Sequence, residues 1–361
     1  MARPDPRRSE RGVTAVLVAI VVVVLGAFLA LALNVGHSRA VRGQLQSAVD
    51  SGALAGAAEL DGTLAPLLAG RPGALASDFT ERHITDRSMP VEIAPTSDVI
   101  PGHWDPFSAD PATAFTPVSP IVTEQDARRV NAVLVRAGRE AARANAVEVA
   151  FSGFVGADRM DVAAEAVAVN GGPCEDSCPD APLAFFACGI EDPDTYQLAC
   201  GRTLRIHFSP DGTDTAGLSS LSLDSANTQT YRNIISGALC RNLQAGDLVN
   251  ISNGQQGSTT LCGPENNQPT FDHYCRADGS GTCTQPREVR APVVDGECPP
   301  RFNQTHQVIG FATFRFVRMV CGGASNSYID VEFLCDEVDD EAGVIGCGWF
   351  GTGPLRPMLV R

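Results

Sequence analysis

Residues 10–60 read ERGVTAVLVAIVVVVLGAFLALALNVGHSRAVRGQLQSAVDSGALAGAAEL, and within them Ala15–Leu33 is an unbroken apolar run. At about 1.5 Å of rise per residue, about 20 helical residues cross a hydrocarbon core of about 30 Å. We therefore expect a transmembrane helix over residues 12–36. The alternative is a cleavable signal sequence, because Ala30-Leu31-Ala32 suits a signal peptidase.

Charge and cysteine position both predict the orientation of this helix. Four arginines precede the apolar run, whereas only Arg39 and Arg42 follow it closely, so the positive-inside bias places the basic stub, residues 1–11, in the cytoplasm. All 12 cysteines lie between Cys174 and Cys347, as expected for a region in an oxidising compartment. We expect a single-pass protein whose C-terminal body is outside the cytoplasm.

The composition limits the classes of function. Hydrophobic residues make up 44% and charged residues 19% of the 361-residue chain, values that are ordinary for a folded protein. The 27 basic residues are all arginine, and 42 acidic residues give a net charge of −15. A body this acidic repels phosphate backbones, so we expect no nucleic-acid partner.

Helical spacing continues beyond the apolar run. Small or apolar residues recur on one face, at Val41, Leu45, Ala48, Gly52 and Gly56. The pattern predicts one rod from Val13 to Glu59, about 70 Å long. Small side chains allow close approach of a neighbouring helix, so we expect a helix-packing face that contacts partner helices. It consists of Ala48, Gly52, Ala55 and Gly56. The alternative is an ordinary surface helix of the outer domain.

Together these features resemble a known family, the TadG-like proteins of the Flp (tight adherence, Tad) pilus-assembly system. The matching positions are Arg11, Gly12, Asn34, Val35, Gly36, Leu45, Gln46, Ala48, Asp50, Ala53, Leu54 and Ala55. Relatives usually have Asp where this chain has Asn34. The resemblance implies a protein of the bacterial inner (cytoplasmic) membrane that assists assembly of a Flp/Tad-type pilus or enters it as a minor subunit. Its implied partners are the membrane, other Tad pilus-assembly membrane proteins and pilins.

A looser resemblance to the outer region of such proteins runs from His103 to Ala168. Residues 130–135 fit either a strand or part of a helix that begins near Glu124, and the resemblance favours the strand. Asp161–Val169 alternates as a strand does. We expect an α+β domain over residues 37–170, which includes the extension of the long helix.

The composition changes at Asn170-Gly171-Gly172-Pro173, where Gly and Pro disfavour regular structure. Beyond this boundary we expect a cysteine-rich, β-dominated domain over residues 171–361. One helix, Thr228–Arg241, is expected to interrupt its strands. The expected strands are Leu204–Phe208, Leu248–Ile251, Val308–Val320 and Tyr328–Leu334.

The cysteines of this region are predicted to form disulfides. The candidates are Cys174, Cys178, Cys188, Cys200, Cys240, Cys262, Cys275, Cys283, Cys298, Cys321, Cys335 and Cys347. Some lie close together in sequence and would close hairpins, namely Cys174/Cys178, Cys188/Cys200, Cys275/Cys283 and Cys335/Cys347, although spacing does not determine connectivity. Zinc binding is the alternative, but there is no Cys-x-x-Cys pair and the six His are scattered.

No motif predicts catalysis, a metal site or a cofactor. Gly346–Gly351 matches the dinucleotide-binding fingerprint by letter, but no helix and strand are expected after it, so we expect a turn. The sequence therefore favours a non-enzymatic protein without cofactors. The alternative function is a secreted or anchored cell-envelope module that recognises a polysaccharide or protein ligand at the cell surface.

Overall fold

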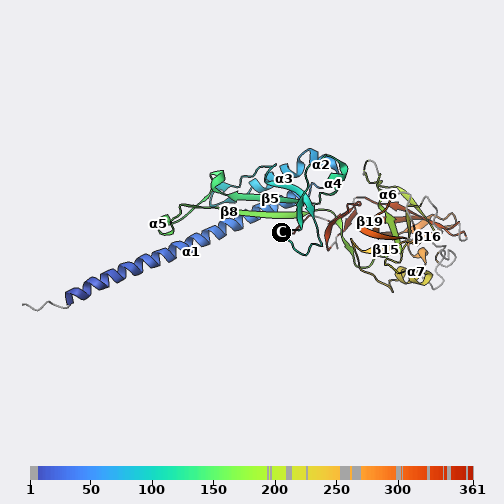
Figure 1. Ribbon diagram of the computed structural model, residues 1–361. Helices are drawn as coiled ribbons and strands as arrows, with labels where there is room; N and C mark the ends of the chain where they lie inside the picture. Colours follow the sequence, from blue (N-terminus) through green and yellow to red (C-terminus); the bar gives the residue numbers. More distant parts are fainter. Residues whose placement is uncertain are drawn as a thin grey trace, which may run out of the picture.

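Three parts follow one another in space: a projecting N-terminal helix, a first body on a five-stranded sheet, and a second body on a seven-stranded sheet (Figure 1). The α+β fold class expected from the sequence, with a long N-terminal helix ahead of β-rich structure, is confirmed. The computed structural model describes residues 7–192, 195, 197–208, 214–224, 227–252, 261, 270–297, 302, 304–322, 326–335, 337–339, 343–354 and 357–360.

Helix α1 (Arg7–Ala57) is continuous over 51 residues, so the predicted rod is confirmed. No proline lies within it, and at about 1.5 Å per residue it is about 75 Å long. Its two halves have different surroundings. The large apolar side chains from Val16 to Leu33 project into open space, whereas Val41, Leu45 and Val49 are buried against the first body.

The sheet of the first body is antiparallel, in the order β24-β8-β5-β3-β4. Its strands are β3 (Val99–Trp104), β4 (Phe115–Pro117), β5 (Ala132–Arg139), β8 (Val162–Val169) and β24 (Met358–Leu359). Val133 and Val135 of β5 pack in the same apolar cluster as α1, while Leu134 faces the opposite side with Trp104. The alternation follows from the two-residue period of a strand. Both expected strands are confirmed: β8 begins one residue later than the expected 161–169, whereas β5 begins two residues later and ends four residues later than the expected 130–135.

Three short helices lie beside α1 and the sheet: α3 (Arg71–Glu81) packs on α1 and β3, and α2 (Leu64–Leu68) contacts α3 and α4 (Glu124–Arg128). Two hairpins extend along α1. One consists of β1 (Ile84–Thr85) and β2 (Met89–Pro90), and the other of β6 (Val147–Glu148) and β7 (Arg159–Met160) with α5 (Ser152–Val155) at its tip. The 3-10 helix η1 (Ala141–Arg143) links β5 to β6.

The predicted packing face of α1 is occupied by the chain itself. A Cβ atom placed on Gly52 would lie 2.0 Å from Thr80 Oγ1 and 2.9 Å from the Ala76 carbonyl oxygen, both on α3. At Gly56 it would lie 3.0 Å from the carbonyl oxygen of Pro72. The partner predicted for Ala48, Gly52, Ala55 and Gly56 was a helix of another protein. The structure corrects this, because α3 of the same chain fills the close-approach positions.

The second body is built on the order β12-β20-β19-β18-β11-β13, with β15 also paired to β19. Its aromatic core includes Phe185 stacked on Phe314, with centroids 3.5 Å apart, and Tyr274 stacked on Phe316. The strands of the sheet are β11 (Leu183–Phe186), β12 (Thr203–His207), β13 (Ala216–Leu218), β15 (Leu248–Asn250), β18 (Glu288–Val294), β19 (Thr305–Val320) and β20 (Tyr328–Phe333). The four strands predicted in this region are confirmed.

Smaller elements complete the second body. They are β9 (Gly172–Pro173), β10 (Glu175–Asp176), α6 (Ala187–Ile190), α7 (Thr228–Ile235), β14 (Leu243–Gln244), η2 (Phe271–His273), β16 (Cys275–Ala277), β17 (Cys283–Pro286), β21 (Glu337–Asp339), β22 (Ile345–Cys347) and β23 (Thr352–Pro354). The helix predicted over Thr228–Arg241 ends early, at Ile235. Gly237 adopts a left-handed conformation there, with φ of 71°, and its N–H bonds the carbonyl of Ile234. A left-handed glycine is a common helix stop.

Disulfides cross-link the second body, most of them between residues far apart in sequence. They join Cys174 to Cys347, Cys178 to Cys240, Cys200 to Cys335 and Cys275 to Cys283. Of the four near-neighbour pairs considered from the sequence, Cys275/Cys283 is confirmed and the other three are wrong. The sheet brings together residues that are far apart along the chain, so sequence proximity does not select the partner. Cys188 and Cys321 are also disulfide-bonded, while Cys262 and Cys298 lie outside the described residues.

The chain returns to the first body near its end. Strand β24 pairs with β8, with Met358 opposite Val169. The second sheet therefore lies between two segments that belong to the first body. A simple boundary at residue 170, with everything beyond it in a separate domain, does not describe this arrangement.

The contact between Gly52 and α3 predicts that Gly52→Ala lowers the free energy of unfolding by about 1–3 kcal/mol, because the added methyl meets a backbone carbonyl. Gly43→Ala is the matched control in the same helix, since a Cβ atom placed on Gly43 would have no other group within 4 Å. This control should be neutral or more stable by up to about 1 kcal/mol. Urea unfolding of the detergent-solubilised chain, followed by tryptophan fluorescence, measures both. Equal stability of the two variants would contradict the packing.

Candidate functional site

The N-terminal half of α1 carries a long apolar surface that is mostly exposed. Each large apolar side chain from Val16 to Leu33 is 46–66% exposed. Soluble monomers rarely expose contiguous apolar patches beyond a few hundred Å². By length and composition this helix is able to cross a membrane. The structure thus presents one candidate membrane span, with two protein bodies on its C-terminal side (Figure 1).

Asn34 attaches the C-terminal end of this span to the hairpin β6–β7. Its side-chain amide donates from Nδ2 to the Ala150 carbonyl at 2.8 Å, and its Oδ1 accepts from the Ala150 N–H at 2.7 Å. The side chain is only 4% exposed. Because this pairing needs one donor and one acceptor, an amide satisfies both backbone groups, whereas a carboxylate only accepts.

A second hairpin holds the next turn of α1. The turn between β1 and β2 brings Asp86 to His37, with His37 Nε2 and Asp86 Oδ1 2.8 Å apart. Gln44 Oε1 also accepts from the Asp86 N–H at 3.0 Å. Arg139 approaches the same carboxylate at 3.7 Å. Two hairpins therefore contact α1 just beyond the apolar run.

Further out, α1 borders a polar groove of about 700 Å³ that includes Gln46. Gln46 Nε2 donates to Asp50 at 2.8 Å and to the Glu165 carbonyl at 3.1 Å, which ties α1 to β8. Arg143 donates two hydrogen bonds to Asp98 in the same groove, at 2.7 and 2.8 Å. Burial raises the pKa of Asp98, but the bonds from Arg143 and the Ala94 N–H outweigh burial, so the net pKa lies below its ordinary value. These charges pair with one another.

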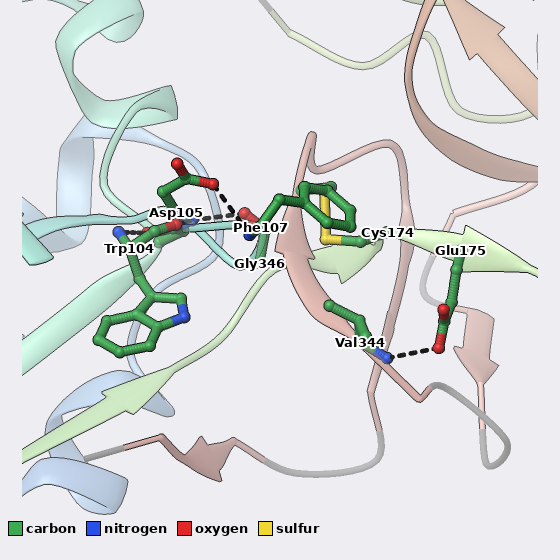
Figure 2. Close-up of a disulfide and its surroundings, with 9 residues drawn as sticks. Trp104, Asp105, Phe107, Cys174, Glu175, Val344 and Gly346 are labelled. Atoms are coloured by element: carbon green, nitrogen blue, oxygen red, sulfur yellow. Dashed lines mark hydrogen bonds between the residues drawn. A yellow bond between two sulfur atoms is a disulfide. The ribbon is translucent and has the colours of Figure 1, made fainter. Parts of the chain in front are cut away.

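The junction between the two bodies is built around Asn131 and the Cys174–Cys347 disulfide. Asn131 Oδ1 accepts from the Trp104 N–H at 2.6 Å, and its Nδ2 donates to the carbonyls of Trp104 and Gly346. Next to it, the Cys174 N–H donates to the Val344 carbonyl at 2.8 Å. Figure 2 shows the disulfide, which joins Cys174, between β9 and β10, to Cys347 of β22. Of the dinucleotide-like motif, Gly346 and Cys347 lie in β22 at this junction, and Gly348–Gly351 connect β22 to β23, so the expected turn covers only the second part of the motif.

An ion pair also crosses the junction. Arg128 of α4 in the first body pairs with Glu191, which follows α6 in the second body, and both side chains are largely buried. Burial raises the pKa of Glu191, while the Arg128 guanidinium partly offsets this effect. Because a buried charge is costly without its partner, this pair disfavours separation of the bodies.

Ionisable groups are not gathered into a reactive centre in the part of the chain that the structure describes. No three of its His, Cys, Asp and Glu residues lie together in a geometry that could hold a metal ion. His207 pairs with Asp214, and His273 lies beside Arg287 elsewhere on the second body. The chemistry that the arrangement supports is attachment: an apolar helix at one end and a disulfide-linked body at the other.

Comparison with known families agrees with this geometry. Residues 12–59 match the family described as putative Flp pilus-assembly TadE/G-like, and residues 55–168 match the family described as putative Tad-like Flp pilus-assembly. The two matches together span α1 from Gly12 and the first body as far as β8. No curated protein and no solved structure matches the chain. Residues 12–168 are thus similar to TadG-like proteins of the Flp/Tad pilus-assembly system, and these matches support a pilus-related role.

The position of Asn34 predicts a specific loss on substitution. Asn34→Asp keeps the acceptor for the Ala150 N–H but loses the donor to the Ala150 carbonyl, at a local cost of about 1–3 kcal/mol. Hydrogen exchange of peptides covering residues 147–158 should accelerate at neutral pH, and more so in Asn34→Ala. Protonation of the aspartate at low pH restores a donor, so normalised protection should recover there. Unchanged exchange in both variants would refute the contact.

The junction disulfide predicts a difference between two double replacements. Cys174–Cys347 spans 173 residues of sequence and Cys275–Cys283 spans only 8. The Cys200–Cys335 disulfide shortens the loop that Cys174–Cys347 closes. Loss of Cys174–Cys347 should therefore lower the free energy of unfolding by about 4 kcal/mol, and loss of Cys275–Cys283 by about 2.5 kcal/mol. Proteolysis near residues 170–173 should accelerate only when Cys174 and Cys347 are changed to Ser. Equal proteolysis in the two double variants would contradict a role in holding the bodies together.

Proposed function

We propose that this protein is a non-enzymatic, membrane-anchored component of a Flp/Tad-type pilus system, which assists pilus assembly or enters the pilus as a minor subunit. The supporting observation is that one continuous helix, α1, contains the exposed apolar segment and also contributes side chains to the core of the first body. Anchoring of this helix in the bilayer would therefore also fix the position of both bodies relative to the membrane. This role needs no catalytic group.

The proposed topology has residues 1–11 in the cytoplasm, residues 12–36 in the inner membrane and both bodies outside. The arginines before the apolar run support this orientation. So do the disulfides, because such bonds persist in oxidising compartments. A retained anchor is further supported by Ala30 and Asn34, which are buried on either side of Ala32, where a signal peptidase would cut.

The proposed partners are other Tad membrane proteins or pilins. Because α3 covers Gly52 and Gly56, lateral contacts with other helices are assigned to the exposed apolar half of α1. The second body lies outside both family matches and is the part most distant from that half (Figure 1). We assign contacts that are specific to this protein to the surface of the second body.

Deletion of the gene, followed by complementation, tests the proposed function. The deletion strain should carry severalfold fewer surface pili by electron microscopy and adhere less, and the full chain should restore both. A version that begins after Leu33 behind a cleavable secretion signal should not restore them. Unaltered piliation in the deletion strain would contradict the pilus role. Full rescue by the released version would contradict anchoring and favour the secreted binding module.

A further inference from the structure

The hairpin β6–β7 extends beyond the sheet of the first body and lies along α1, with α5 at its tip (Figure 1). Its tip, residues 149–157, reads VAFSGFVGA and has no charged residue, whereas Glu148 and Asp158 flank it directly. Phe151 in this segment is 56% exposed. The hairpin tip is therefore an uncharged, largely apolar segment that presents the Phe151 ring to its surroundings.

Contacts with α1 place the hairpin tip at the level of the apolar run. Ala150 bonds Asn34, and α5, which begins two residues later, contacts α1. One helical turn further into the run, Ala30 is fully buried, although Leu29 and Leu31 are 57% and 53% exposed. Burial of Ala30 between two exposed neighbours agrees with the packing of α5 on one side of α1. Ala30 lies about 5 Å inside the outward end of the apolar run at Leu33.

We propose that the hairpin tip inserts into the interfacial layer of the outer leaflet, so that the protein contacts the bilayer at two places. This inference rests on the proposed membrane anchoring of α1. Segments that lie in the interface bury their apolar side chains about 5–10 Å deep, which agrees with the level of Ala30. Insertion would remove the exposed Phe151 ring from water, and the transfer of this apolar surface is favourable in free energy.

The backbone of the hairpin tip is suited to this environment. Polar backbone groups are costly near hydrocarbon unless they are paired. The Val149 N–H donates to the Asp158 carbonyl at 3.0 Å, and the Gly156 N–H donates to the Ser152 carbonyl at 2.8 Å. Ala150 is paired through both of its backbone groups with Asn34. A second contact of this kind fixes the rotation of the first body about α1 and its height above the membrane.

Tryptophan quenching in a bilayer tests the insertion. The full-length variant Phe151→Trp is placed in nanodiscs made either of ordinary phospholipids or of phospholipids with brominated acyl chains. Phe107→Trp is the matched control, because Phe107 is 44% exposed but lies at the junction (Figure 2). The native Trp104 and Trp349 are the same in both variants. We expect blue-shifted emission and loss of intensity in brominated lipid for Phe151→Trp only.

The outcomes separate this inference from the proposed function. If the protein stays in the nanodisc and resists carbonate extraction, yet Phe151→Trp is quenched no more than Phe107→Trp, the hairpin insertion is wrong and the anchor stands. If carbonate releases the full-length protein from membranes, the anchor is wrong and the insertion falls with it. Equal, strong quenching of both variants would also overturn the insertion, because it would show that the first body lies on the bilayer as a whole.

Discussion

A single ladder of helical hydrogen bonds runs through α1, from the exposed apolar segment into the buried face of the first body. Because the helix has no break, the candidate membrane span and the sheet share one rigid axis. Rotation of α1 also rotates Leu45 and Val49, which form part of the core. The close approach of α3 depends on this axis as well, since only glycine fits at residue 52. The same helix therefore supplies both the candidate membrane span and part of the folded core.

The second body is attached to this axis by the return of the chain rather than by a linker. Asn131 hydrogen-bonds Gly346, and Cys174 is joined to Cys347 at the same place. Strand β24 then pairs with β8 in the first sheet. A disulfide at this place restricts the conformations in which the two bodies separate. A region outside the family matches is thus held by the family-matched body at several points.

Several features could be predicted from the sequence because they depend on local pattern. The length of α1 follows from its composition and periodicity, and β8 from its alternation. Other features could not be predicted for physical reasons. Cys174 is near Cys178 in sequence but bonds Cys347, because pairing depends on the sheet. The glycines of α1 indicated a close helix neighbour without specifying which helix. The hairpin tip was missed, although its uncharged residues between Glu148 and Asp158 were a visible signal.

The sequence by itself determined the apolar span, the continuous helix, the β-rich character of the distal region and the family resemblance. These depend on side-chain polarity and on periods of a few residues, which neighbouring positions reveal. Only the tertiary structure decided that α3 covers Gly52, that β24 returns to β8, and that Asn34 meets Ala150 more than 100 residues away. Such contacts depend on how whole elements pack, because the partner of each group is chosen by shape and hydrogen bonding in space rather than by distance along the chain.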